Sequence, residues 1–383
     1  MAKLGEVCKV SASTKMIDKS KAWLLNLDMV EQQTGRVVEY NFVGEDGLNG
    51  SITQFDTENV LYSKLRPNLN KVVLPERDGF CTSELLPLRP DARKLDRSYL
   101  AVFLRSDGFV NWAVSKTAGA KMPRLGTKDL LNANIPLPEI KEQKAIAEKF
   151  KKSEELISLR KQQLVKMDEL VKARFFEMFG EISDNSMNWD CFTIGKLIST
   201  IESGWSGNGK QREKHADEIA VLKVSAVTKG YFIPTECKVL DDQHNIKKYV
   251  YPQKGDILFS RANTKEMVGA TVLIKKDYPD LILPDKLWKI RFCTDVNPIY
   301  MKHVLSTTTV RNAFSAASTG TSGSMYNVSM EKFKGVIIPV PPLSVQNQFA
   351  AFVERVDQQK QTVQQSLEKL ELMKKALMQE YFG

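Results

Sequence analysis

The sequence predicts an α/β protein with two mixed α/β domains, each followed by a long helix, and with the two helices paired. Three observations predict this fold class. Residues 135–180 recur without a gap at 338–383 with 13 identities in 46 positions, where average composition gives about three. Each copy contains a helix-length stretch without glycine or proline. The segments before the copies are rich in short β-type runs separated by turn residues.

Four segments are expected in chain order. They are a mixed domain at residues 1–138, a central long helix at 139–180, a second mixed domain at 181–341 and a second long helix at 342–383. A chain of 383 residues exceeds what one hydrophobic core usually supports, which agrees with several domains. Strands are expected at 60–62, 71–74, 220–224, 256–259 and 286–290, and short helices at 99–104 and 300–305.

Each long helix is preceded by proline, followed by glycine and marked by an apolar residue at every seventh position. Sevenfold spacing keeps one apolar seam facing a partner helix, so we expect the two helices to pair. The expected seam consists of Phe150, Ile157, Leu164 and Val171 in the first helix and Phe349, Val356, Val363, Leu370 and Leu377 in the second.

Composition excludes several classes of protein. Apolar residues make up 42% and charged residues 26%, and no apolar run is long enough to span a membrane. The N-terminal residues lack the apolar core of a signal peptide. The five cysteines are scattered without a CxxC pair, and the three histidines are dispersed. We therefore expect a cytoplasmic protein without a disulfide framework or a metal site.

Two strings resemble catalytic motifs but lack an essential residue. Residues 204–211 approach a nucleotide-binding loop, yet Gln211 stands where Ser or Thr would hold magnesium. Residues 297–300, Asn-Pro-Ile-Tyr, approach the Asn-Pro-Pro-Tyr loop of adenine methyltransferases. A helix start explains them instead, with Asn297 as the cap and Pro298 in the first turn. We expect no catalytic residue and no cofactor in this chain.

Two polar turns, each following an expected strand, are candidates for contact with DNA. The net charge of +9 is compatible with nucleic-acid binding, but it also fits an ordinary solvated surface. Arginine can bind guanine and asparagine can bind adenine at base edges, whereas lysine and serine suit phosphates. An ordinary polar turn is the alternative, and the matching positions in two repeats favour DNA contact. The candidates are Ser63, Lys64 and Arg66 in the first half and Arg261, Asn263 and Lys265 in the second.

Three further segments contain candidate contacts. Residues 117–124 and 319–327 stand at matching places ahead of the long helices, and their small residues permit close backbone approach. The Gly-rich stretch 204–212 ends in two basic residues, although a mobile surface loop is an equal alternative. The candidate side chains are Lys121, Arg124, Ser322, Tyr326, Lys210 and Arg212.

These features together resemble the specificity subunit of type I restriction–modification systems. In both halves a mixed domain is closed by an Ile-Pro-x-Pro string, a glutamine (Gln143 or Gln346) and a long helix. Residues 60–67 and 257–263 are similar to the cores of its target-recognition domains, and 283–288 to the strand that follows such a core. The resemblance covers the whole chain.

The resemblance implies that this chain does no catalysis by itself. It would belong to a complex that acts as an adenine-N6 DNA methyltransferase and ATP-dependent endonuclease. Each target-recognition domain would read one half of a bipartite double-stranded DNA site through the major groove. The chain would position two methyltransferase subunits and the restriction subunits on that site, and S-adenosylmethionine, ATP and Mg would bind those partners.

The resemblance also implies that the two helices pack antiparallel with pseudo-two-fold symmetry and fix the gap between the half-sites. Inverted domains suit half-sites on opposite strands. Two other classes stay open. A self-sufficient methyltransferase–nuclease would use the same recognition domains but needs cofactor and catalytic loops. A structural coiled-coil adaptor would explain the helices but not the repeated Arg/Asn turns.

Overall fold

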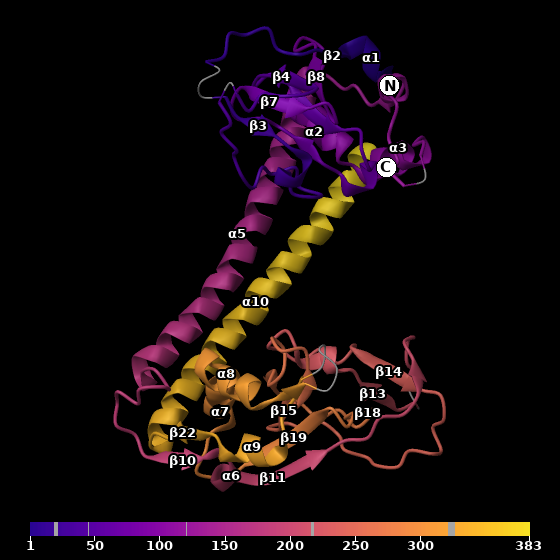
Figure 1. Ribbon diagram of the computed structural model, residues 1–383. Coiled ribbons are helices and arrows are strands. Elements are labelled where there is room, and N and C mark those ends of the chain that lie inside the picture. Colours follow the sequence, from indigo (N-terminus) through magenta and orange to yellow (C-terminus); the bar gives the residue numbers. More distant parts are fainter. Residues whose placement is uncertain (19–21, 45, 120, 216–217, 321–325) are drawn as a thin grey trace. The chain divides into compact units, whose positions relative to one another are not determined.

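The computed structural model describes residues 1–18, 22–44, 46–119, 121–215, 218–320 and 326–383. The chain forms two compact units (Figure 1). Unit 1 contains Met1–Gln163 and Val363–Gly383, and unit 2 contains Leu164–Thr362. Within the described ranges, no helix has the length and apolar character needed to cross a membrane.

Unit 1 contains a four-stranded sheet of order β2-β8-β5-β6, a three-stranded sheet of order β3-β7-β4 and the pair β1-β9. The strands are β1 Ala2–Lys3, β2 Cys8–Val10, β3 Leu24–Leu25, β4 Ile52–Phe55, β5 Val60–Ser63, β6 Val72–Val73, β7 Gly79–Thr82, β8 Leu85–Pro90 and β9 Asn134–Ile135. The helices are α1 Leu4–Val7, α2 Arg97–Leu104, α3 Asp107–Ser115 and α4 Thr127–Leu131, with 3-10 turns η2 Leu27–Met29 and η3 Pro67–Leu69.

Unit 2 contains four-stranded sheets of order β11-β19-β15-β17 and β12-β14-β13-β18, the small sheet β16-β21-β20 and the pair β10-β22. Its strands are β10 Cys191–Thr193, β11 Ile198–Ser203, β12 Gly209–Lys210, β13 Ala220–Leu222, β14 Cys237–Leu240, β15 Ile257–Ser260, β16 Ala262–Asn263, β17 Thr271–Leu273, β18 Leu281–Ile282, β19 Leu287–Phe292, β20 Thr319–Gly320, β21 Tyr326–Asn327 and β22 Ile337–Pro339. Its helices are α6 Ile194–Leu197, α7 Pro298–Ser306, α8 Thr308–Ala317 and α9 Met330–Gly335, with the 3-10 turn η4 Val224–Val227.

The two units repeat one plan. The sheet β2-β8-β5-β6 matches β11-β19-β15-β17 in strand order, and all neighbours in both are antiparallel. In each unit the first strand pairs with the strand that carries the Ile-Pro string, as β1 with β9 and β10 with β22. The predicted duplication therefore extends over the mixed domains, and it is the second sheets that differ in order and strand number.

The middle strand of the shared sheet contributes to two cores. All four residues of β5 and of β15 are buried. Because successive side chains of a strand point to opposite faces, Val60 and Tyr62 join one cluster and Leu61 joins another. In β15, Phe259 and Leu258 divide in the same way. Burial on both faces explains the continuous apolar runs that predicted these strands.

The two long helices are present as predicted, as α5 Ile140–Phe179 and α10 Leu343–Phe382. They pack together within each unit. Within unit 1, Lys374 bonds Glu154 at 2.7 Å and Lys161 approaches Glu371 at 3.0 Å. Residue numbers rise along one helix as they fall along the other, so the pairing is antiparallel. The boundaries between the two compact units fall near the middle of both helices. The expected boundaries 138/139 and 341/342 instead separate each mixed domain from the helix that follows it in the sequence.

The helix seam is wider than the sequence indicated. Ile146, Val353 and Leu367 are also buried, and they belong to the neighbouring heptad positions. Polar residues on this face form ion pairs, as Lys360 does with Asp168 at 2.6 Å in unit 2. Of the predicted seam, Phe150, Val171, Phe349, Val356 and Val363 are buried and Ile157, Leu164, Leu370 and Leu377 are half-buried.

The end of each long helix completes the core of one unit. In unit 1, the ring of Phe382 packs on Tyr99 with centroids 5.3 Å apart. In unit 2, the ring of Phe179 packs on Tyr300 at 4.8 Å. Each unit therefore needs the first half of one long helix and the last half of the other.

Candidate nucleic-acid interface

The first candidate turn in unit 1 begins where β5 ends. Ser63 is buried, and its hydroxyl donates a hydrogen bond to the carbonyl oxygen of Leu65 at 3.0 Å. The structure thus gives Ser63 a role in shaping the turn, and its contact with DNA stays a prediction. Lys64 is half-buried and Arg66 is exposed, and within the described part of the chain neither side chain has a hydrogen-bond or ion-pair partner.

The second candidate segment of unit 1 packs directly against the first. The Arg66 N–H donates to the Pro123 carbonyl at 2.8 Å, and the Leu125 N–H donates to the Lys64 carbonyl at 2.9 Å. Arg124 forms β-bridges with residues on both sides, Leu65 and Ala118. Two segments that are far apart in the sequence therefore form one surface. The sequence predicted both segments but not their contact.

Unit 2 builds the corresponding surface from the corresponding segments. Strand β21 lies between β16 and β20, with Tyr326 opposite Asn263. The Val328 N–H donates to the Arg261 carbonyl at 2.9 Å, as Leu125 does to Lys64 in unit 1. Tyr326 and Asn263 are half-buried, whereas Lys265 is exposed. Ser322 lies outside the described residues.

Two of the arginines are held by neighbouring groups. The guanidinium of Arg124 donates to both carboxylate oxygens of Glu84, at 2.9 and 3.3 Å. This pairing lowers the pKa of Glu84. The Nε–H of Arg261 donates to the Asp285 carbonyl at 3.0 Å. Sequence reasoning missed Glu84 and Asp285 as supports, because their contacts depend on strand pairing rather than on a local motif.

The Gly-rich stretch of unit 2 is attached to the same turn. The Ser206 hydroxyl donates to the Asp285 carboxylate, and Trp205 N–H donates to the Leu283 carbonyl at 2.9 Å. A Cβ on Gly204 would lie 1.9 Å from that carbonyl oxygen, so this close approach requires glycine. Through Asp285 the stretch is therefore joined to Arg261.

The two basic residues at the end of this stretch differ. Lys210 lies exposed in β12. Arg212 forms a two-point ion pair with Glu218, at 2.8 and 2.5 Å, which lowers the pKa of Glu218 to about 2. Lys121 in unit 1 is exposed and has no partner among the described side chains.

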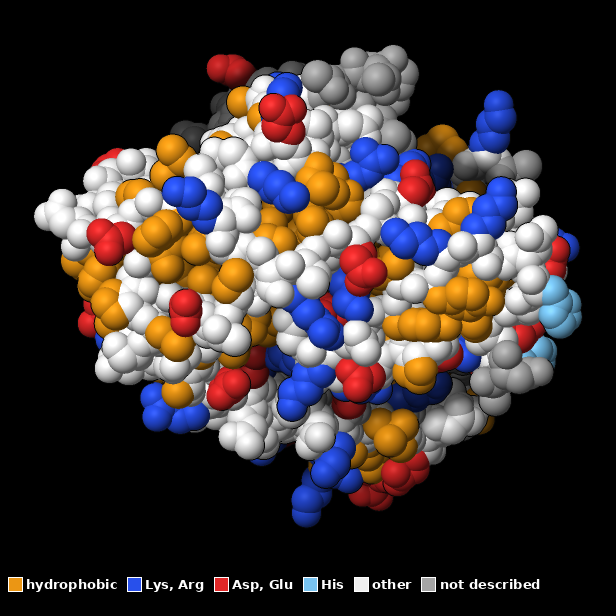
Figure 2. Space-filling view, turned by 90° about the horizontal axis from the view of Figure 1, so that it is seen from below, with side chains coloured by type: hydrophobic (Ala, Val, Ile, Leu, Met, Phe, Trp, Pro, Cys, Tyr) orange, Lys and Arg blue, Asp and Glu red, His pale blue; other side chains and the backbone are white. Residues whose placement is uncertain are grey.

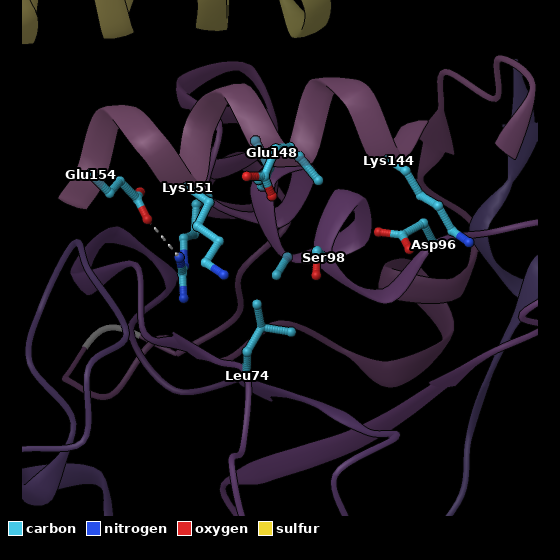
Figure 3. A pocket seen from close by; sticks show the side chains of 11 residues that line it. Leu74, Asp96, Ser98, Lys144, Glu148, Lys151 and Glu154 are labelled. Carbon is cyan, nitrogen blue, oxygen red and sulfur yellow. Dashed lines mark ion pairs between the residues drawn. The ribbon is translucent and has the colours of Figure 1, made fainter. Parts of the chain in front are cut away.

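Basic side chains are spread over the face drawn in Figure 2. Figure 2 shows one face on which Lys and Arg are interspersed with acidic and hydrophobic residues rather than gathered in one patch. A pocket in unit 1 with a volume of about 260 Å³ also has mixed charge (Figure 3). Arg105 lines it, and its guanidinium lies 3.7 Å from the Glu154 carboxylate. Because acidic residues match the basic ones, this pocket does not resemble an anion site.

The strings that approach catalytic motifs have structural roles. Asn297 caps α7 by accepting a hydrogen bond from the Ile299 N–H at 2.8 Å, and Pro298 occupies the first turn, which confirms the predicted helix start. Across the residues that the structure describes, no group of three or more His, Cys, Asp or Glu is arranged to hold a metal ion.

Comparison with known proteins defines the class. A family model described as the type I restriction modification DNA specificity domain matches residues 1–168 and 188–372. The EcoKI specificity subunit of Escherichia coli strain K12 is 27% identical over 286 residues, which are 71% of this chain and 60% of that protein. The StySPI specificity subunit of Salmonella potsdam is 26% identical over 290 residues, with the same coverages of 71% and 60%.

Solved structures share the fold. The type I restriction–modification S subunit from M. genitalium has a TM-score of 0.60 at 12% identity, covering 100% of this chain and 95% of that one. A chain from a structure on complex assembly and conformational transition of the type I system has a TM-score of 0.59 at 19% identity, covering 100% and 96%.

The family match defines the class of protein, and the solved structures share its fold. The chain belongs to the specificity-subunit family of type I restriction–modification systems, as the sequence resemblance predicted. The matched region spans 60% of the length of the curated relatives named above.

Proposed function

We propose that this chain is a non-catalytic subunit that reads a bipartite DNA site, with one half-site for each unit. The observation that carries the proposal is the surface built twice from the same two segments. In unit 1 it joins Arg66 to Arg124, and in unit 2 it joins Arg261 and Asn263 to Tyr326. Duplicated surfaces that combine base-reading and phosphate-binding side chains suit two half-sites.

The residues of these surfaces divide into two kinds. Arg124 and Arg261 are each held by bonds from part of the guanidinium, to Glu84 and to the Asp285 carbonyl. The remaining N–H groups are then oriented for contact with base edges. Arg66 and the exposed lysines form no hydrogen bond or ion pair among the described side chains, which suits contact with phosphates. These lysines are Lys121, Lys210 and Lys265. Lys210 extends the surface of unit 2, and Arg212, like Arg124, is held by a two-point ion pair with a carboxylate.

Partner subunits are proposed to dock on the long helices. Some residues are identical in the two repeats. Packing explains the identical residues that are buried, but it does not explain those that are exposed. On one face of each helix, exposed residues that are identical in the two repeats surround an apolar residue. We name this face the docking stripe. It consists of Gln162, Lys166, Leu170, Ala173 and Glu177 in α5, and of Gln365, Lys369, Met373, Ala376 and Glu380 in α10, all of them exposed.

Two equivalent stripes suit two copies of one partner, the adenine methyltransferase subunit, with which restriction subunits would associate. S-adenosylmethionine, ATP and Mg are proposed to bind these partners. Leu170→Arg or Met373→Arg should each release one methyltransferase copy, as measured by the mass of the complex. Val165→Arg, an exposed change on another face of α5, is the matched control. Retention of both copies in Leu170→Arg would contradict the stripe.

Selection from a random double-stranded DNA library, using the chain with its methyltransferase partner, tests the function. We expect two short sequences separated by an unread gap. A structural adaptor would select no sequence. Methyl transfer or cleavage by the chain alone, supplied with S-adenosylmethionine, ATP and Mg and shown free of other subunits, would instead support a self-sufficient enzyme.

A further inference from the structure

A buried glutamine fastens the first turn of each long helix to its domain. Gln143 stands three residues after the start of α5, and Gln346 stands at the same place in α10. Both are completely inaccessible to solvent. A buried primary amide is costly unless its oxygen and both of its hydrogens have partners, so these partners define the role of the residue.

In unit 1 the amide of Gln143 is fully bonded. Its Oε1 accepts a hydrogen bond from the Asp96 N–H at 2.8 Å. Its Nε2 donates to the carbonyl oxygens of Lys94 at 2.9 Å and Pro138 at 2.8 Å. Asp96 is the N-cap of α2, and Pro138 ends the Ile-Pro-x-Pro string. One side chain therefore joins a domain helix, the string and the long helix.

Unit 2 repeats this arrangement. The Oε1 of Gln346 accepts from the Asn297 N–H at 2.8 Å, and its Nε2 donates to the Pro341 carbonyl at 2.8 Å and to the Asp295 carbonyl at 3.5 Å. Asn297 is the N-cap of α7, the counterpart of α2. The same three segments are joined by the same three kinds of bond.

A tyrosine makes a second attachment at each joint. The hydroxyl of Tyr99 donates to the Pro136 carbonyl at 2.9 Å, and that of Tyr300 donates to the Pro339 carbonyl at 2.7 Å. Both rings are buried. A larger hydrophobic core would stabilise the domains equally well, but directed hydrogen bonds also fix an angle.

We propose that Gln143 and Gln346 are positioning residues that hold each domain at a fixed angle to its helix and so restrict the complex to one gap length between half-sites. This inference rests on the proposed function. A domain of about 130 residues has a radius of gyration of about 14 Å, so its centre lies roughly 20 Å from a joint on its surface. A tilt of about 10° would move that centre by about 3.5 Å, which is one base-pair step.

The test measures the affinity of the complex with its methyltransferase partner for DNAs that share both half-sites but differ in gap by one base pair. The wild type should favour one gap. Gln143→Leu and Gln346→Leu should each lower that preference at least several-fold, while discrimination against mutated half-sites stays unchanged. Gln348→Leu, an exposed glutamine in the same helix turn, should behave as the wild type.

The ratio of the affinities for two gap lengths distinguishes a positioning role from a role in stability alone. A variant that is only less stable would lose affinity for every gap by the same factor, and that result would overturn the inference. Tyr99→Phe and Tyr300→Phe remove one hydroxyl and keep the ring, so they provide folded variants in which a smaller loss of gap preference is expected. A wild type that selects no bipartite site would overturn the proposed function itself, which is a distinguishable outcome.

Discussion

Single arginines on the two surfaces proposed to read DNA differ in how firmly neighbouring groups hold them. Arg124 is fixed by two bonds to Glu84, and Arg261 by one bond to the Asp285 carbonyl. A guanidinium that is already oriented loses less side-chain freedom on binding, so it suits a base edge. Arg66 lacks such a support among the described residues and suits a phosphate. Neighbouring groups, rather than residue type alone, therefore distinguish the two roles.

Replacing Arg261 and Asn263 by Ala should impair the reading of one half-site. Loss of a good two-point contact costs about 1–3 kcal/mol of base discrimination. Lys64→Ala with Arg66→Ala should instead weaken binding to all sequences by a similar factor, because these side chains suit phosphates, and binding titrations measure that loss. Library selection with each variant measures the half-site preferences. Equal changes in both half-site preferences from the Arg261 and Asn263 variant would mean that the units do not read separate half-sites.

One buried carboxylate should make unit 1 sensitive to acid. Burial alone would raise the pKa of Asp56, but hydrogen bonds from Ser13, the Glu58 N–H and Arg89 lower it below its usual value. A depressed carboxyl pKa contributes stability that is present above the unfolded pKa of about 3.9 and is lost as the pH falls through the folded value.

Asp56→Asn should therefore destabilise unit 1 at pH 7, by about 1–3 kcal/mol, because charged hydrogen bonds are lost in a buried place. It should also flatten the fall in stability between pH 5 and 3. Urea denaturation at a series of pH values measures both. An acid dependence identical to that of the wild type would assign the effect to other carboxylates.

The long helices owe their stability to packing at the seam. Phe150→Ala should destabilise unit 1 by about 3–5 kcal/mol, because the ring is 1% exposed and its removal leaves a cavity. Leu156→Ala on the same helix is the control, since Leu156 is 46% exposed. Thermal unfolding compares them. Equal shifts in the two variants would mean that the seam is not the stabilising face.

The sequence predicted the elements better than the contacts between them. The long helices, the strands at β5 and β15 and the Asn297 cap follow from local patterns, and the structure confirms them. The pairing of the turn after β5 with residues 117–124 depends on strands far apart in the chain, which no local pattern specifies. Ser63 suits phosphate by its type, and no local pattern predicted its burial or its bond to the Leu65 carbonyl.

At the scale of the whole molecule, the paired helices should act as a ruler. Adding one heptad to both helices, after Leu164 and Leu367, keeps the seam in register. Seven residues add ~10 Å, and base pairs lie ~3.4 Å apart, so the preferred gap should lengthen by about three base pairs. Three pairs also rotate the duplex by about 105°, which should weaken binding.

Library selection with the lengthened protein measures the new gap. The half-site sequences should persist, because the reading surfaces are untouched. An unchanged gap in a verified insertion would mean that the helices do not set the spacing, which would then depend on the partner subunits.

Because each core is closed by an aromatic residue from the end of a long helix, the units differ in when they can fold during synthesis. Unit 2 is one continuous segment, Leu164–Thr362, and it contains its closing residue, Phe179. Unit 1 cannot complete its core until Phe382 is synthesised, and the ribosome adds Phe382 long after Tyr99. A nascent chain stalled with residue 362 just outside the ribosome should therefore hold a protease-resistant unit 2 beside a protease-sensitive unit 1. The half that is made first would be finished last.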